Sequence, residues 1–231
     1  MRRTFLSLVT FVAALGCSQL RATIYNDSIG DVFTGAGGGI LDITSVEVTN
    51  NASDIFFTIS LNGPIASPND WGNYMVGIDS GPGGDTATPV GNPWSRPISM
   101  SGGMNYWLGS WVNGGGGAQL WTYSGSWSGP GAAAVESFGS QNFTIKASLA
   151  ALGLSPGNSF NFDVYSSGAD GNPGAIDSLS NPNQTINDWG VAYQNGPVSI
   201  YTVTPVPEPG LLSLVGLGGL ILFQRVFRRR V

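Results

Sequence analysis

Apolar and polar residues alternate over much of this chain, as they do in strands that bury one face. The clearest alternation is the segment DIFFTISL, Asp54 to Leu61, in which every second residue from Ile55 onward is apolar. The same period predicts further strands over residues 44–49, 74–78, 106–112, 119–123, 142–146, 160–164 and 198–202, the last with Val198 and Ile200 on its apolar face.

Clusters of Gly, Pro, Asn and Asp separate these segments, and they favour turns because Gly supplies positive φ and Pro fixes φ. The clearest lie at residues 62–64, 81–84, 114–117 and 129–131. Ser148 to Leu152 predicts a single helical turn that ends at Gly153. Short strands without alternating helices predict an all-β fold, an antiparallel β-sandwich of about eight or nine strands.

Near the amino terminus the alternation gives way to a continuous apolar run. Arg2 and Arg3 precede this run, Phe5 to Leu15, and together they have the charge and length of a secretory signal peptide. We expect residues 1–22 to be that signal, with cleavage after Ala22. An alternative is lipidation at Cys17, because the residues before it vaguely resemble a lipobox.

Residues 205–231 have three parts. The first holds the extended segment Val206, Pro207, Glu208 and Pro209. An apolar run follows, which predicts one transmembrane helix over about residues 210–227. The last part is rich in arginine, and its arginines are expected to stay cytoplasmic: Arg225, Arg228, Arg229 and Arg230.

The Pro-Glu-Pro motif, the hydrophobic helix and the arginine-rich end together resemble the PEP-CTERM sorting signal of Gram-negative bacteria. The resemblance implies export through the inner membrane and transient anchoring there. It also implies a partner, an exosortase-type membrane protease that processes the chain near Glu208, after which the protein reaches the cell surface or is secreted. The alternative is an ordinary membrane anchor behind a proline-rich spacer.

Residues 23–204 remain as one domain, and their charge is strongly acidic. Of nine basic residues only Arg96 and Lys146 lie there, with every acid except Glu208. Such a surface repels phosphate backbones, so we expect no nucleic-acid partner. The chain has no His, which removes the usual general base and favours a protein that is not an enzyme. A hydrolase that uses a carboxylate pair stays an alternative.

Aromatic side chains are the first candidates for recognition. Trp107 and Trp111 are four residues apart on one predicted strand and therefore share a face, and Trp121 and Tyr123 share a face of the next. Exposed, these rings would offer flat platforms for sugar rings. Buried, they would be ordinary core, and the sequence leaves both interpretations open.

Acidic loops are the second candidates, and calcium is the only cofactor that they suggest. Asp79 and Asp85 flank a Gly/Pro-rich loop, and Asp170 and Asp177 lie in another. Carboxylate oxygens suit a hard cation, and calcium is available to exported proteins. The alternative is that these Asp side chains form turns by bonding their own backbone.

Residues 148–154 (SLAALGL), with the later segment FNFDVY at 160–165, resemble the late strands of the DOMON-like sandwich. That superfamily includes family-9 carbohydrate-binding modules, and its members bind sugars, haem or no known ligand. Haem binding there needs Met and His ligands, and this chain has no His, so the resemblance implies a β-sandwich that does not bind haem. We therefore expect a non-enzymatic protein of the cell envelope or extracellular matrix, associated with exopolysaccharide. The first alternative is a dedicated carbohydrate-binding module with exposed Trp platforms.

Overall fold

The computed structural model describes residues 22–33, 35–36, 39–65, 71–87, 91–113, 116–169, 173–181, 186–191, 193–194 and 197–206. The side chains of residues 134–136 and 194 are also outside this description. Asp170, residues 1–21 of the predicted signal peptide and residues 207–231 of the predicted tail therefore lie outside the described residues. Within the described part, no helix has the length and apolar character needed to span a membrane.

The described chain is built from strands and turns. The strands are β1 (Thr23–Asn26), β2 (Ile43–Asn50), β3 (Asp54–Leu61), β4 (Asn73–Asp79), β5 (Ile98–Ser99), β6 (Tyr106–Trp111), β7 (Gly117–Tyr123), β8 (Trp127–Phe138), β9 (Asn142–Ser148), β10 (Ser159–Ser167), β11 (Asp177–Ser178), β12 (Tyr193–Gln194) and β13 (Ser199–Thr202). The predicted all-β, antiparallel class is confirmed, and the predicted bounds of Asp54 to Leu61 match β3.

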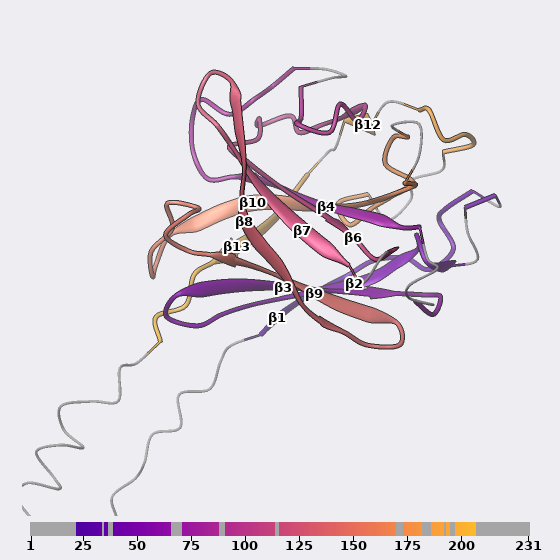
Figure 1. Ribbon diagram of the computed structural model, residues 1–231, viewed down its shortest axis with the longest axis horizontal. Coiled ribbons are helices and arrows are strands. Elements are labelled where there is room, and N and C mark those ends of the chain that lie inside the picture. The colour runs from indigo at the N-terminus through magenta and orange to yellow at the C-terminus, as the bar shows by residue number, and fades with distance from the viewer. Residues whose placement is uncertain are drawn as a thin grey trace, which may run out of the picture. The chain divides into compact units, whose positions relative to one another are not determined.

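One antiparallel sheet contains most of these strands, in the order β1-β2-β3-β9-β8-β7-β6-β4-β10-β11, with β13 also paired to β10. It curls so that β1, β2, β3 and β9 lie opposite β7, β6, β4 and β10 (Figure 1). The sheet has eleven strands in the described residues, more than the eight or nine predicted. The predicted number of strands was too low, because strands such as β11, with two residues, are too short to show an alternation.

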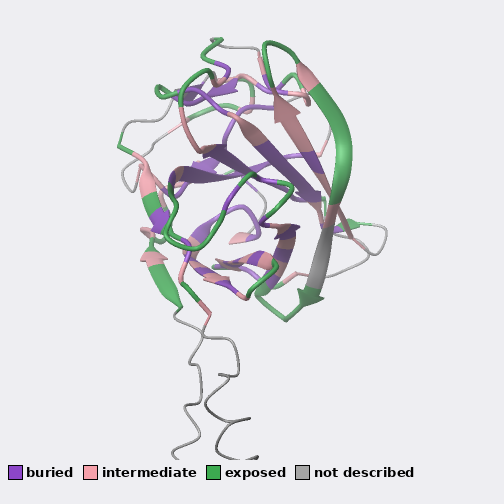
Figure 2. Cartoon of the chain, turned by 90° about the vertical axis from the view of Figure 1, so that its left-hand side faces the viewer, coloured by how far each residue is buried: buried purple, intermediate pink, exposed green. Residues whose placement is uncertain are grey.

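Strand β8 is the bridge between the two halves, because its first part pairs with β7 and its second with β9. The prediction of a turn at Gly129-Pro130-Gly131 was wrong, since these residues lie inside β8. The register with β7 shifts between Leu120 and Thr122, opposite Pro130, and a bulge tolerates the missing N–H of proline. Figure 2 shows that β8 is mostly exposed, so no apolar alternation marks it.

The main core fills the space between the two halves of the sheet. Phe57 of β3 meets Phe162 of β10 with ring centroids 5.7 Å apart, and Tyr74 of β4 meets Phe143 of β9 at 4.6 Å. All four side chains are fully buried. Each Å² of apolar surface that is buried stabilises the fold by about 25 cal/mol, so such a core is the main source of stability.

Strand β13 buries the opposite face from the one predicted. Ile200, expected on its buried face, is 61% exposed, whereas Tyr201 is buried. Tyr201 packs on Phe160 and donates a hydrogen bond to Asn50 Oδ1. The helical turn predicted before Gly153 is present: Leu152 N donates to Ser148 O, and Gly153 has φ +62°, where glycine ends a turn without strain.

A second, smaller core covers the outer face of β4, β6 and β10. The parallel pair β5 and β12 lies over this face together with the loops around it. The residues buried there are Met75, Ile98, Met100, Met104, Trp107, Tyr165, Ala175 and Tyr193. Because β4 is covered on both sides, all its residues from Asn73 to Ile78 are buried. The cover leaves one end of the outer face open, and the candidate site lies there.

Candidate functional site

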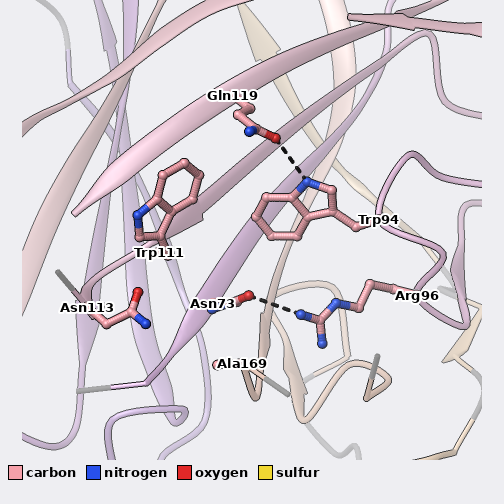
Figure 3. Close-up of a pocket in the computed structure, with 7 residues that line it drawn as sticks. All are labelled: Asn73, Trp94, Arg96, Trp111, Asn113, Gln119 and Ala169. Carbon is pink, nitrogen blue, oxygen red and sulfur yellow. Dashed lines mark hydrogen bonds between the residues drawn. The ribbon is translucent and has the colours of Figure 1, made fainter. Parts of the chain in front are cut away.

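An open pocket of about 550 Å³ lies beside the second core, on the outer face of the sheet. Its walls are two half-buried indoles, Trp94 from the loop before β5 and Trp111 at the end of β6. Polar side chains and one alanine complete the lining: Asn73, Arg96, Asn113, Gln119 and Ala169. Figure 3 shows the two indoles side by side, with Gln119 above them and Arg96, Asn73 and Asn113 below.

Two glycines make room for these indoles. A Cβ on Gly109 of β6 would lie 2.2 Å from Trp94 Cζ2, and a Cβ on Gly117 of β7 would lie 2.2 Å from Trp111 Cζ2. Trp94 therefore lies against the backbone between Trp107 and Trp111, with ring centroids 6.3 and 6.4 Å away. The planes of Trp94 and Trp111 are inclined by 44°, so the pocket has an angled aromatic wall.

Gln119 of β7 fixes the orientation of Trp94. Its Oε1 accepts hydrogen bonds from Trp94 Nε1 at 3.2 Å and from Trp121 Nε1 at 3.3 Å. Gln119 lies directly opposite Gly109 in the β6–β7 register. Sheet geometry and one hydrogen bond to Gln119 thus hold Trp94, although it is carried by a loop, and the bond from Trp121 fixes Gln119 in turn.

Arg96 forms the floor of the pocket and is almost fully buried, with 3% of its surface exposed. Its guanidinium donates to Asn73 Oδ1 at 3.0 Å, to Ser167 Oγ at 3.0 Å and to the carbonyls of Gly168 and Pro173. All four acceptors are neutral, and burial lowers the pKa of Arg96 to about 10. The guanidinium carbon also lies 5.9 Å from the centre of the Trp94 ring. Arg96 therefore ties β4 and β10 to the loop that carries Trp94.

The four aromatic residues singled out in the sequence lie in different environments. Trp107 and Trp111 share a face, as predicted, but Trp107 is fully buried in the second core and only Trp111 lines the pocket. Trp121 packs against that core. Tyr123 lies against Trp127, with ring centroids 5.3 Å apart. The structure therefore brings one of the four to the pocket.

Trp94 and Arg96 were missed as site residues by the sequence analysis. Both lie in the loop GNPWSRP, which has no periodicity to indicate a face. One signal was present: Gly109 interrupts β6 between two tryptophans, and a glycine within a strand often marks the close approach of another group. The signal shows that something lies over Gly109 but does not identify it.

The loop after β4 uses its carboxylates within the fold. Asp79 accepts hydrogen bonds from Gly81 N and Asn161 Nδ2. Asp85 is buried and accepts from Ala87 N and from Trp127 Nε1 at 2.7 Å. Neither belongs to the group of three acids that the described residues bring together, and their contacts fit the turn-forming alternative.

Asp177 does belong to that group, with Asp27 and Asp31 of the turn after β1. One carboxylate oxygen from each lies within 4.8 Å of the others. Burial raises the pKa of Asp27 to about 7, that of Asp31 to about 6 and that of Asp177 to about 9. Repulsion from neighbouring acids adds to each increase, and for Asp31 that neighbour is Asp42, outside the group. Asp27 and Asp31 carried no signal in the sequence, since β1 is short and exposed.

Comparison of the chain with models of known protein families gives no match, and comparison with curated proteins gives none either.

Proposed function

We propose that this protein is an exported, non-enzymatic component of the bacterial cell envelope or extracellular matrix that binds polysaccharide in the Trp94–Trp111 pocket. The observation that carries the proposal is the aromatic wall itself, two inclined indoles held open to the surface by the sheet. The apolar face of a sugar ring stacks on such a surface, while its hydroxyls need polar partners nearby. Asn113 and Gln119 supply amide groups in the same pocket.

The lining favours binding over hydrolysis. Glycoside hydrolysis uses two carboxyl groups on either side of the bond that is cut. None of the seven described residues that line the pocket is an Asp or a Glu. The pocket therefore offers contacts for a saccharide but no acid and base pair, which supports the binding module among the alternatives.

Export and sorting are the second part of the proposal, and their support is the sequence of the two ends. Residues 1–22 carry the charge and the apolar run of a signal peptide. Residues 205–231 carry the Pro-Glu-Pro motif, an apolar segment and terminal arginines. In this proposal the tail holds the chain at the inner membrane until an exosortase-type protease processes it, and the domain then reaches the surface or the matrix.

The finer fold class belongs to the same proposal. The two facing halves of the curled sheet share one core, which is the packing of a β-sandwich. The resemblance of residues 148–154 and 160–165 to the late strands of a DOMON-like sandwich supports the same class. Sugar binding on an outer face would suit that class.

The binding proposal is tested by affinity electrophoresis of the full chain in detergent, in gels that contain exopolysaccharide from an exosortase-bearing bacterium. We expect the polysaccharide to retard the wild type, and W111A to bind about tenfold more weakly or worse because it loses half of the aromatic wall. W71A is the matched control, since Trp71 is 37% exposed and outside the pocket lining. Equal retardation of W111A and wild type would refute the pocket.

A further inference from the structure

The two ends of the curled sheet meet around the group of three acids. Asp27 directly follows β1, which is the first strand of the sheet order, and Asp177 begins β11, which is the last. The curl brings them together, and Asp177 Oδ2 accepts a hydrogen bond from Ile43 N at 2.6 Å. Here, "acidic cluster" means Asp27, Asp31 and Asp177. It lies at a junction that the antiparallel hydrogen bonds of the sheet do not close.

The backbone shapes this junction. Asp42, which is buried, accepts hydrogen bonds from Gly30 N at 2.9 and 3.2 Å and so fixes the turn between Asp27 and Asp31. Asp27 Oδ1 accepts from Ser28 N, and Asp177 Oδ1 accepts from Ser178 N, both at 2.8 Å. These bonds hold the turn and the carboxylates of Asp27 and Asp177 in place.

Three oxygens of the acidic cluster are buried without a partner. They are Asp27 Oδ2, Asp31 Oδ1 and Asp31 Oδ2, and each exposes less than 1 Å². Both oxygens of the Asp31 carboxylate are thus covered, and neither accepts a hydrogen bond from another residue. An unpartnered buried carboxylate is among the most costly groups in a fold, because it loses its hydration and gains nothing in return.

Only negative charges act on the cluster. The charged groups that influence Asp27 are Asp31, Asp163 and Asp42, and those that influence Asp177 are Asp27 and Asp31. No basic side chain offsets this repulsion in the described part of the chain. A positive charge at the centre would satisfy the open oxygens and remove the repulsion together.

We infer that Asp27, Asp31 and Asp177 bind one calcium ion, which joins the first strand of the curled sheet to the last. Calcium takes carboxylate oxygens at 2.3–2.6 Å, so one ion can contact ligands that lie within 4.8 Å of one another. The all-oxygen ligand set excludes the usual zinc chemistry. Calcium takes six to eight oxygens in flexible geometry, whereas magnesium demands an octahedron and retains its waters.

The inference does not depend on the polysaccharide pocket. None of the three acids lines that pocket, and calcium in the cluster would act on the stability of the domain. Beside the cluster, Tyr25 of β1 packs on Phe162 of β10 with ring centroids 5.0 Å apart. The ion would reinforce this contact between strands that lie far apart in the sheet order, at a strand that is otherwise short and exposed.

Calorimetric titration of the calcium-depleted full chain in detergent with CaCl₂, together with thermal unfolding in CaCl₂, in MgCl₂ and in EDTA, tests the inference. We expect one calcium per chain and a higher midpoint of unfolding in calcium than in magnesium or EDTA. D31N should weaken calcium binding by about tenfold or more. It should still fold in EDTA, because the Asp31 carboxylate accepts no hydrogen bond from another residue.

D54N is the matched control. Asp54 starts β3, whose far end, Leu61, pairs with Ile43 beside the cluster, so the length of a strand separates Asp54 from the site. D54N should bind calcium as the wild type does. Loss of binding in D79N but not in D31N would place the ion elsewhere and overturn the inference. An equal midpoint of the wild type in calcium and in EDTA would also overturn it.

Discussion

At the scale of single residues, Asp163 shows how this fold accommodates a buried acid. It is fully buried in β10, where Oδ1 accepts from Val164 N and Ser180 N and Oδ2 accepts from the hydroxyls of Ser178 and Ser180 at 2.8 and 2.7 Å. Burial raises the pKa of Asp163 to about 6, even though these hydrogen bonds lower it. The loss of hydration thus outweighs four good contacts.

The raised pKa predicts how pH changes stability. Between about pH 4 and pH 6 the folded state holds a proton on Asp163 that the unfolded chain releases, so the free energy of unfolding falls as pH rises, by about 3 kcal/mol in all. D163N removes this contribution and keeps hydrogen-bonding groups at the same place. The stability advantage of wild type over D163N should therefore shrink from pH 4 to pH 6. Denaturant unfolding in EDTA, followed by tryptophan fluorescence, measures it, and parallel pH profiles would refute it.

Single residues also show where sequence reasoning stops. The shared face of Trp107 and Trp111 could be predicted, because side chains alternate along a strand. Their different burial could not, since it depends on which loop covers which end of the outer face. Trp107 lies under the β5–β12 cover, and Trp111 lies just beyond it. The acidic cluster has the same origin, because Asp27 and Asp177 come together only through the curl of the sheet.

At the scale of elements, strands with one buried face could be predicted from their period, and β3 is the clearest case. Strand β8 could not, because it is exposed over most of its length and contains Gly129 and Pro130. Strand β13 could be placed but not oriented. Its buried residue, Tyr201, packs on Phe160, and the apolar Ile200 points away. Because Ile200 is apolar but exposed, the alternation along β13 is still visible in the sequence, but it assigns the buried face to the wrong residues.

The contact between Gly109 of β6 and Trp94 of the loop over it leads to a prediction about this element. In G109A the new methyl group would meet the Trp94 ring at 2.2 Å, so the indole must leave its place against the strand and lose its bond to Gln119. We expect a loss of about 1–3 kcal/mol in the free energy of unfolding, and weaker polysaccharide binding. G131A is the control, because its Cβ would have no neighbour closer than 3.5 Å.

Denaturant unfolding and affinity electrophoresis of the two alanine variants measure both effects. G131A should match the wild type in binding. If G109A binds polysaccharide as tightly as G131A does, the position of Trp94 on β6 is irrelevant to recognition.

At the scale of the whole molecule, the fold class could be predicted from the sequence but the closure of the sheet could not. Alternating segments without helices are sufficient for an antiparallel all-β fold. The curl depends on β8, which pairs with β7 in its first part and with β9 in its second, so a single strand serves both halves. That arrangement leaves an outer face for the pocket and a junction for the acidic cluster. The two candidate sites are therefore consequences of topology.

We propose that the domain is exported and held in the extracellular matrix through its aromatic pocket. The most direct measurement is the amount of protein in the matrix and in the medium of an exosortase-bearing host, with the intact mass of the chain recovered from each. We predict a wild type cleaved near Glu208 and retained in the matrix, and W111A cleaved equally but released to the medium, with W71A as the wild type. An uncleaved wild type, or W111A retained in the matrix, would contradict the account.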